Sequence, residues 1–225
     1  MPNATGVRSV ASNQNAVHAD LEKLVRRYLG SQYQRPFAWH TIEAFKQAQS
    51  FISSFTEPVV LDSGCGNGES TFVLATKFPK HPVIGIDKSL FRISKSESKE
   101  QPVNALFLQA ELLDFWRLAL QAEWKVCYHA LYYPNPWPKE SQVGRRFHAH
   151  PIFPTLLKLC SNIELRTNWK TYAEEFLEAS QIAINHLQVK ATPVLEQWLP
   201  KDPETAFERK YLANGQALWR VKKKI

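Results

Sequence analysis

The sequence predicts an α/β protein with a doubly wound, mostly parallel sheet and an N-terminal helical extension. Three observations lead to this prediction. Short apolar runs alternate with helical patterns from about residue 58 onward, which is typical of strands joined by crossover helices. A glycine-rich segment follows the first apolar run and opens a helix. A stiff segment, Pro134–Lys139, follows a later apolar run that has the character of a buried strand.

The elements are expected in a regular order along the chain. Two helical patterns, His18–Leu29 and Thr41–Phe55, make up the extension, which is expected to span residues 1–57. Residues 58–225 are expected to form the domain with the sheet. Its strands are predicted at Pro58–Leu61, Val83–Ile86, Ala105–Leu108, Val126–Tyr133, Ile163–Thr167 and Ala217–Val221. Its helices are predicted at Glu69–Phe78, Leu90–Lys99, Leu112–Gln121, Ile152–Leu159 and Tyr172–His186.

Composition indicates a protein of the cytoplasm. Apolar residues make up 44% of the chain, enough for a substantial core. The three cysteines form no CxxC pair, so neither a disulfide framework nor a metal site is predicted. The polar start lacks the apolar core of a signal peptide, and no apolar run approaches the roughly 20 residues that span a bilayer. The sequence does not indicate an oligomeric state.

The charge of the chain predicts an anionic partner. The formal net charge is +7 and the sequence pI is about 9.3. Nucleic acid is the usual partner of such a protein, and an acidic membrane surface is the competing interpretation. The chain has no strongly basic amphipathic helix with a clean apolar face, so RNA is favoured over a membrane.

The segment Asp62-Ser63-Gly64-Cys65-Gly66-Asn67-Gly68 carries the first candidate site. Its alternate glycines allow a tight turn and a close approach of the backbone to a ligand. The absence of a terminal Gly-Lys-Ser/Thr excludes a P-loop. An aspartate directly before the first glycine would repel a pyrophosphate, but it suits a cationic amino-acid group such as the methionine part of S-adenosylmethionine. The alternative is a tight strand–helix turn without a ligand.

Two further acids strengthen the prediction of S-adenosylmethionine as cofactor. Asp87, at the end of the second predicted strand, suits the two hydroxyls of a ribose. Glu111, just beyond the third strand, is placed to face the adenine edge. The predicted cofactor-binding residues are therefore Asp62, Gly64, Gly66, Asp87 and Glu111.

The proline-rich segment carries the second candidate site. Three prolines in five positions hold Asn135 and Trp137 outward on a stiff loop at the end of a strand, where open α/β folds place their chemistry. Lys139, Arg145 and Arg146 form a basic cluster beside it that suits phosphate oxygens. The alternatives are a proline-rich turn without a function and, for Arg145 and Arg146, a pair of solvent-exposed charges without a ligand.

These motifs resemble a known family. Leu61–Gly68 resembles motif I of class I methyltransferases. Pro134–Lys139 followed by Arg145-Arg146 is similar to the signature of bacterial tRNA (guanine-N7)-methyltransferases. The resemblance continues in Thr167–Trp169, Tyr172–Glu174 and Thr205–Arg209. It implies methyl transfer from S-adenosylmethionine to N7 of a guanosine in the variable loop of tRNA.

The resemblance also assigns roles to residues, which stay expectations here. Asn135 falls on the family's catalytic aspartate and Lys139 on a substrate contact. Asn168 takes the place of a second substrate-binding aspartate. Thr205 and Glu208 match the ends of a Thr-x-x-Glu element that binds substrate.

The chain departs from the family pattern at two places. Both substrate-side aspartates are asparagines, at positions 135 and 168, and residues 140–144 lack the family's His and Lys/Arg. Tyr133–Trp137 also resembles the Asn-Pro-Pro-aromatic loop of methyltransferases that act on exocyclic amines. Methylation of an amine or another base in RNA, and a non-catalytic RNA-binding role, are therefore the alternatives.

Overall fold

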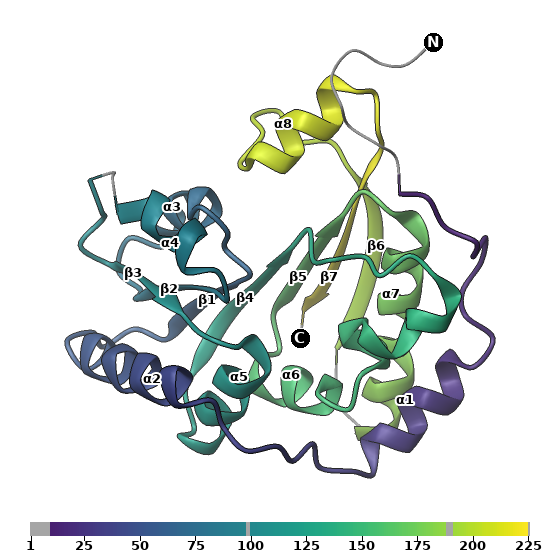
Figure 1. The fold of residues 1–225 in the computed structure, drawn as a ribbon, viewed down its shortest axis with the longest axis horizontal. Helices are drawn as coiled ribbons and strands as arrows, with labels where there is room; N and C mark the ends of the chain where they lie inside the picture. Colours follow the sequence, from purple (N-terminus) through teal and green to yellow (C-terminus); the bar gives the residue numbers. More distant parts are fainter. Residues whose placement is uncertain (1–9, 98–99, 188–190, 225) are drawn as a thin grey trace. The chain divides into compact units, whose positions relative to one another are not determined.

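The computed structural model describes residues 10–97, 100–187 and 191–224 of the 225-residue chain (Figure 1). The chain divides into two compact units. We call the unit of residues 34–132 and 155–163 the glycine-loop unit. We call the unit of residues up to 33, 133–154 and from 164 onward the proline-loop unit. Each is described by itself.

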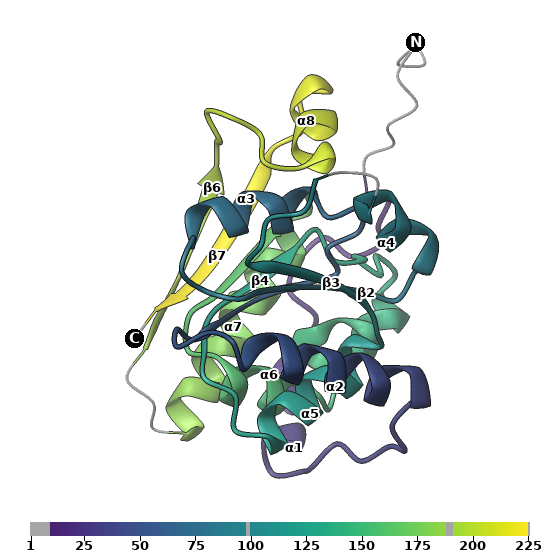
Figure 2. The ribbon, with the colours of Figure 1, turned by 90° about the vertical axis from the view of Figure 1, so that its left-hand side faces the viewer.

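The glycine-loop unit contains a parallel sheet with the strand order β3-β2-β1-β4. Figure 2 shows α3 and α4 on one face of these strands and α2 and α5 on the other, so this sheet is doubly wound. Parallel strands covered on both faces are expected to be apolar along their whole length, and all five residues of β1 and of β2 are buried. The elements are α2 (Trp39–Ile52), β1 (Val59–Ser63), α3 (Glu69–Lys77), β2 (Val83–Asp87), α4 (Leu90–Glu97), β3 (Ala105–Gln109), α5 (Leu112–Gln121) and β4 (Val126–Tyr132).

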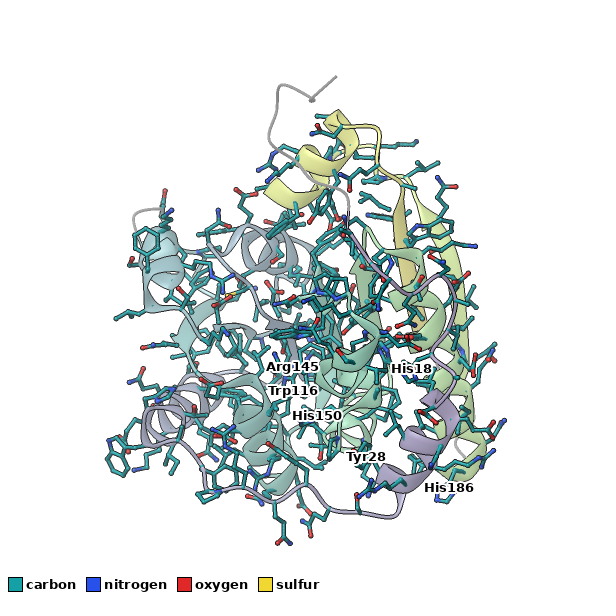
Figure 3. All side chains as sticks on the ribbon, turned by 45° about the vertical axis from the view of Figure 1, so that its right-hand side comes forward. His18, Tyr28, Trp116, Arg145, His150 and His186 are labelled. Atoms are coloured by element: carbon teal, nitrogen blue, oxygen red, sulfur yellow. The ribbon has the colours of Figure 1, made fainter. Side chains whose placement is uncertain are left out.

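A buried polar chain fixes the end of β1 in this unit. The indole of Trp116, labelled in Figure 3, donates its Nε1–H to Ser63 Oγ at 2.9 Å. Ser63 Oγ also lies 2.8 Å from His129 Nε2 on β4. Burial lowers the pKa of His129 to about 3, so its imidazole is neutral at physiological pH. Because Ser63 directly precedes Gly64, this chain anchors the start of the glycine-rich turn.

The proline-loop unit contains the strands β5, β7 and β6, in that order. β6 and β7 pair antiparallel from Thr192↔Lys224 to Trp198↔Leu218. The long helix α7 packs on α1, β6 and β7, and it buries a stripe that includes Tyr172, Phe176 and Ala179. The elements are α1 (Leu21–Leu29), the 3₁₀ helices η1 (Glu140–Arg145) and η2 (Phe147–Ala149), β5 (Ile163–Thr167), α7 (Lys170–Leu187), β6 (Thr192–Trp198), α8 (Ala206–Ala213) and β7 (Leu218–Lys224). The helix α6 (Phe153–Leu159) has its first two residues in this unit.

The structure confirms the predicted fold class. Every strand predicted from the apolar runs is present, with small differences in its ends. The last two residues of the predicted helix Leu90–Lys99 lie outside the described residues. The helices α1 and α2, assigned together to an N-terminal extension, belong to different units, and the boundary after residue 57 stays a prediction. No helix in the described part of the chain has the length and apolar character needed to cross a membrane.

Besides the short 3₁₀ helices η1 and η2, two elements were missed from the sequence, and these two lie near the C-terminus. β6 carries Pro193 and alternates irregularly, which is typical of an edge strand and weakens its signal. α8 is capped by Thr205, the residue before its first turn, whose side chain accepts a hydrogen bond from the Glu208 N–H. The Thr-x-x-Glu spacing is the sequence signature of a helix start, and it would have predicted this helix.

Candidate functional site

The glycine-rich turn leaves open space beside its backbone. Gly64, Gly66 and Gly68 have φ angles of 82°, 60° and 82°, a region that side-chain-bearing residues rarely adopt. A Cβ built on Gly64 or Gly66 would meet no heavy atom of the described chain within 4 Å. A Cβ on Gly68 would lie 2.5 Å from Cε1 of Phe107. Gly68 therefore serves internal packing, whereas Gly64 and Gly66 leave room for a ligand to approach the main chain.

Asp62 ties the end of β1 to the start of α3. Its carboxylate is buried, and Oδ2 accepts hydrogen bonds from Ser70 Oγ and Thr71 Oγ1, both at 2.6 Å. Both hydroxyls lie in the first turn of α3. Asp62 therefore fixes the shape of the glycine turn and places a negative charge beneath it.

Asp87 lies against the same turn. Its Oδ2 accepts from the Gly66 N–H at 3.1 Å, and its Oδ1 accepts from the Ser89 N–H at 2.8 Å. Arg92 Nη2 is 3.0 Å from Oδ1. The structure thus brings together the glycine turn and the acid at the end of β2, as the sequence predicts.

Glu111 stands at the corresponding position after β3. It is the N-cap residue of α5, and its N–H donates to Thr41 Oγ1 at 3.0 Å. The preceding residue, Ala110, donates its N–H to the Asp87 carbonyl at 3.0 Å. Asp62 near the end of β1, Asp87 at the end of β2 and Glu111 just beyond β3 therefore lie at the carboxyl ends of three neighbouring parallel strands.

The carboxylates of Asp62 and Asp87 make the electrostatic potential at this edge negative. Burial raises the pKa of the Cys65 thiol well above its usual value, and the charges of Asp62 and Asp87 raise it further. The thiol is therefore neutral, and two carboxylates act on the centre of the turn. Such a field favours a cationic group on the ligand and disfavours a pyrophosphate. The charges of Asp62 and Asp87 and the open space beside Gly64 and Gly66 fit S-adenosylmethionine, which carries a sulfonium and an ammonium group.

The proline loop, residues 133–139, has an unusual backbone. Tyr133 and Trp137 have φ angles of 51° and 46°, values that are strained for aromatic residues. Asn135 between them is exposed, and its Oδ1 accepts from the Trp137 N–H at 3.3 Å. The loop therefore presents Asn135 to solvent from a conformation that its surroundings must hold in place.

Arg146 holds the second half of this loop. Its guanidinium donates to the Trp137 carbonyl from Nε at 3.2 Å and from Nη2 at 3.0 Å, and to the Lys139 carbonyl at 3.3 Å. Its Nη1 donates to Glu175 Oε2 at 2.6 Å. Arg146 is fully buried. The structure corrects its predicted role, because a guanidinium bonded on all sides inside the unit positions the loop and does not reach a phosphate.

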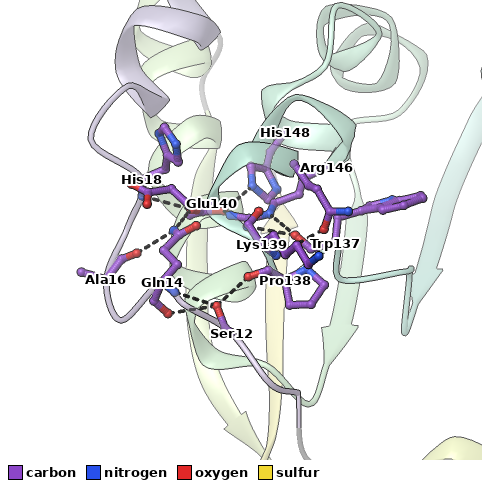
Figure 4. A network of polar contacts seen from close by, with 12 residues as sticks. Ser12, Gln14, Ala16, His18, Trp137, Pro138, Lys139, Glu140, Arg146 and His148 are labelled. Carbon is purple, nitrogen blue, oxygen red and sulfur yellow. Dashed lines mark hydrogen bonds and ion pairs between the residues drawn. The ribbon is translucent and has the colours of Figure 1, made fainter.

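Glu175 is a buried positioning residue that sequence reasoning missed. Its Oε1 accepts from Gln14 Nε2 at 2.6 Å and from the His18 N–H at 3.0 Å, and its Oε2 lies 2.9 Å from His148 Nε2. Figure 4 labels these three partners. Ser12 Oγ in turn donates to the Pro138 carbonyl at 2.6 Å. Its position on the apolar stripe of α7 is the sequence signal that could have indicated it. An acid on the buried face of a helix requires hydrogen-bond partners for its carboxylate.

Arg145 and Lys139 keep the predicted exposed positions. Arg145, labelled in Figure 3, is the last residue of η1, and its guanidinium carbon lies 4.8 Å from the centre of the Trp137 ring. Lys139 is exposed at the end of the loop. Both cations are on the same unit as Asn135 and are available for contact with an anion.

The remaining predicted substrate residues lie around α8 and the end of β5. Asn168 is half-buried and donates from Nδ2 to Gln216 Oε1 at 2.9 Å. Thr205 caps α8. Glu208 is fully buried and accepts at Oε1 from Arg166 Nη1 at 2.8 Å and from the Tyr133 hydroxyl at 3.0 Å. Its predicted contact with substrate is therefore corrected to an internal role, because its oxygens bind groups of the same unit.

Comparison with known proteins identifies the family. A family model described as "Putative methyltransferase" matches residues 56–221, most of the chain. The chain belongs to this methyltransferase family. The methyltransferase is 26% identical over 163 residues to a tRNA (guanine-N(7)-)-methyltransferase of Thermotoga maritima, covering 70% of this chain and 51% of the relative. It is 26% identical over 197 residues to the enzyme of that name from Pediococcus pentosaceus, covering 80% of this chain and 87% of the relative.

Solved structures confirm the fold of this methyltransferase. The 16S rRNA methyltransferase KamB matches with a TM-score of 0.54 and 16% identity, over 84% of this chain and 95% of KamB. An antibiotic-related methyltransferase matches with a TM-score of 0.53 and 16% identity, over 86% and 97%. Both have the fold seen here, and at this level of identity the likeness extends to the fold alone.

Proposed function

We propose that this protein transfers a methyl group from S-adenosylmethionine to N7 of a guanosine in the variable loop of tRNA. The observation that carries the proposal is the glycine turn flanked by Asp62 and Asp87, in a chain whose relatives are named as tRNA (guanine-N(7)-)-methyltransferases. The chain spans about half of the Thermotoga relative and most of the Pediococcus relative. The substrate tRNA is found in the cytoplasm, where we propose that the protein acts.

The glycine-loop unit supplies the residues for the cofactor. Gly64 and Gly66 allow the main chain to approach it, because no side chain stands in that space. Asp87 accepts from a ribose hydroxyl, since a carboxylate has room for about four hydrogen bonds and Gly66, Ser89 and Arg92 take three of them. Asp62 favours the cationic methionine part through its charge, and Glu111 faces the adenine. When bound, S-adenosylmethionine supplies an electrophilic methyl group on its sulfonium.

The proline-loop unit supplies the residues for the acceptor. Guanine N7 is a neutral nitrogen with a free lone pair, so no base has to remove a proton before it attacks. The protein's contribution is then mainly to hold N7 in line with the methyl group at near-attack distance. Asn135 accepts guanine N–H groups with its side-chain carbonyl, and the strained loop fixes its direction. Arg145 and Lys139 contact backbone phosphates of the tRNA.

Transfer of a labelled methyl group tests the proposal. Purified protein is incubated with labelled S-adenosylmethionine and bulk unmodified tRNA, and the tRNA is digested to nucleosides. The label is expected in 7-methylguanosine. Label in an N-methylated amine or another base would overturn the N7 assignment in favour of the amine-type loop. If no label is transferred and calorimetry detects no binding of S-adenosylhomocysteine, the protein is a non-catalytic RNA-binding relative.

A further inference from the structure

A segment without helix or strand lies against the proline loop. It comprises residues 12–18 of the proline-loop unit, directly before α1, and we call it the N-terminal strap. Figure 4 shows it beside Pro138 and Glu140. Its apolar residues are the exposed Ala16 and the half-buried Val17, so the burial of apolar surface gives it little attachment. Polar groups must therefore hold the strap in place.

One end of the strap contacts the proline loop and the residue after it. Ser12 Oγ donates to the Pro138 carbonyl at 2.6 Å, and Asn13 Oδ1 accepts from the Glu140 N–H at 3.0 Å. Ser12 Oγ itself accepts from the Gln14 N–H at 2.9 Å, which leaves the hydroxyl proton for Pro138. The two bonds to the loop join residues that are 126 and 127 positions apart in the chain.

The other end of the strap is bound to Glu175. The Gln14 side chain is buried, and its Nε2 donates to Glu175 Oε1 at 2.6 Å and to the Ala16 carbonyl at 2.7 Å. The His18 N–H donates to the same Oε1 at 3.0 Å. The second oxygen, Oε2, accepts from Arg146. The strap and Arg146 therefore share one buried carboxylate, which anchors the strap next to the loop.

The contacts of the strap and of Arg146 converge on the main chain around Lys139. Ser12 and Asn13 bind the residues directly before and after it. The Lys139 carbonyl accepts from Arg146 Nη2 at 3.3 Å, and the Lys139 N–H donates to Gln142 Oε1 at 3.3 Å. The side chain of Lys139 is exposed. A lysine on a fixed main chain loses less conformational freedom when its ammonium group meets a phosphate.

The bonds from the strap to the loop contribute little to the stability of the fold. Asn13 and Glu140 are exposed, and Ser12 is half-buried. Water replaces a hydrogen bond between exposed groups at little cost when a protein unfolds. These bonds therefore determine the direction of the loop more than they stabilise the unit.

We propose that Ser12 and Asn13 are positioning residues that hold the main chain at Lys139, so that its ammonium group contacts a phosphate of the tRNA. The two residues act through the main chain and do not touch the substrate. This inference rests on the proposed function in taking tRNA as the substrate and Lys139 as a phosphate contact.

The affinity for tRNA tests this positioning. Binding to an unmodified tRNA transcript is measured at several salt concentrations for the wild type, Asn13→Ala, Lys139→Ala and the double variant. We expect Asn13→Ala to bind about three- to tenfold more weakly, the loss that one hydrogen bond accounts for. Lys139→Ala should bind at least as weakly, and its plot of log K against log salt should be shallower by roughly 0.7–0.9, the value for one phosphate contact. Asn13→Ala should make the plot shallower in the same direction.

The double variant shows whether Asn13 acts through Lys139. It should bind tRNA no more weakly than Lys139→Ala alone, because the positioning has no effect once the ammonium group is removed. In methyl-transfer kinetics, Asn13→Ala should raise KM for tRNA while kcat and the affinity for S-adenosylhomocysteine stay the same. A general loss of structure would change all three quantities.

Three further variants are the controls. Ser12→Ala should weaken binding as Asn13→Ala does, and it provides the same test if Asn13→Ala fails to fold. Ser12→Thr keeps the hydroxyl that bonds to Pro138, so it should bind tRNA like the wild type. Asn15→Ala removes another exposed asparagine of the strap and is the matched control, which should also bind normally. Circular dichroism should give the same unfolding temperature for Asn13→Ala and Asn15→Ala.

The outcomes separate this inference from the proposed function. Wild-type affinity and salt dependence in both Ser12→Ala and Asn13→Ala would overturn the positioning, as would additive losses of affinity in the double variant, even if the wild type forms 7-methylguanosine. Weaker binding without additivity supports the positioning, even if the wild type methylates a different atom. If the wild type does not bind tRNA, the inference is overturned together with the substrate on which it rests.

Discussion

At the scale of single residues, Asn135 is the position on which the proposed acceptor chemistry depends. Its amide is exposed, and it stands between two aromatic residues in the left-handed backbone region. An amide accepts a hydrogen bond from guanine more weakly than a carboxylate does, because it carries no charge. We therefore expect Asn135 to recognise the guanine base more weakly than an aspartate would, with an unchanged geometry of attack.

Two substitutions at this position have opposite expected effects. Asn135→Asp should raise kcat/KM for tRNA about tenfold, since a charge-assisted hydrogen bond is roughly twice as strong as a neutral one. Asn135→Ala should lower kcat/KM about tenfold or more while the affinity for S-adenosylhomocysteine stays the same. Methyl-transfer kinetics and calorimetry measure the two quantities. Unchanged turnover in both variants would remove Asn135 from the site.

The glycines of the turn also differ at the residue scale. Gly64→Ala should cost about 1–2 kcal/mol of unfolding free energy from backbone strain alone, because its Cβ meets open space. Gly68→Ala should cost about 3 kcal/mol or more, because the same strain is joined by a clash with Phe107. Only in Gly64→Ala should the loss of S-adenosylmethionine affinity exceed what the loss of stability explains. Urea unfolding and calorimetry compare the pair, and equal effects of the two variants would argue against a ligand beside Gly64.

At the scale of elements, two buried arginine–glutamate groups fix the ends of the proline loop. Arg166 and Glu208 hold Tyr133 at its start, and Arg146 and Glu175 hold Trp137 and Lys139 at its end. Strained aromatic residues persist only where surrounding groups enforce their conformation. These clusters therefore explain how a short loop keeps Asn135 in one place.

The Arg146–Glu175 group predicts how stability depends on pH. Burial would raise the pKa of the Glu175 carboxyl, but hydrogen bonds from His148 and Arg146 and the charge of Arg146 outweigh it and lower that pKa to about 2. The folded state then binds fewer protons than the unfolded chain between about pH 4.5 and 2, so the unfolding free energy should fall by about 3 kcal/mol as pH drops through this window. Above about pH 4.5 the ionised Glu175 carboxylate contributes its full stabilisation.

Urea unfolding at pH 7 and at pH 3 measures this dependence. Glu175→Gln should be less stable at pH 7 by about 3 kcal/mol or more, because Arg146 loses its buried carboxylate, and it should lack this part of the acid sensitivity. Glu174→Gln on the same helix removes a half-buried acid that pairs with the exposed Lys170, and it is the matched control, with an expected change within about 0.5 kcal/mol. Equal acid sensitivity of the wild type and Glu175→Gln would contradict the assignment.

The sequence predicted elements better than it predicted the direction of side chains. Alternating apolar runs predicted the parallel strands, because both faces of such a sheet are buried. The adjacent residues Arg145 and Arg146 read alike as surface cations, yet one is exposed and the other fully buried. Their difference depends on Glu175, which lies 29 positions away from Arg146 in the chain. Such long-range pairings have no local sequence signal.

At the scale of the whole molecule, the residues that we propose for the cofactor and for the acceptor belong to different units. The three carboxylates at the sheet edge are in the glycine-loop unit, and Asn135, Lys139 and Arg145 are in the proline-loop unit. The net charge of +7 favours association of the chain with an RNA backbone. Methyl transfer requires the two sets of residues to act on one substrate, so the product formed on tRNA reports on both at once.

Mass spectrometry of tRNA nucleosides tests the central claim most directly. Bulk tRNA is isolated from cells that contain this protein, from cells that lack it, and from cells that carry Asn135→Ala. The account predicts that 7-methylguanosine falls when the protein is absent and is restored by the wild-type chain, with weaker restoration by the variant. An unchanged amount of 7-methylguanosine, with loss of a different methylated nucleoside, would contradict it.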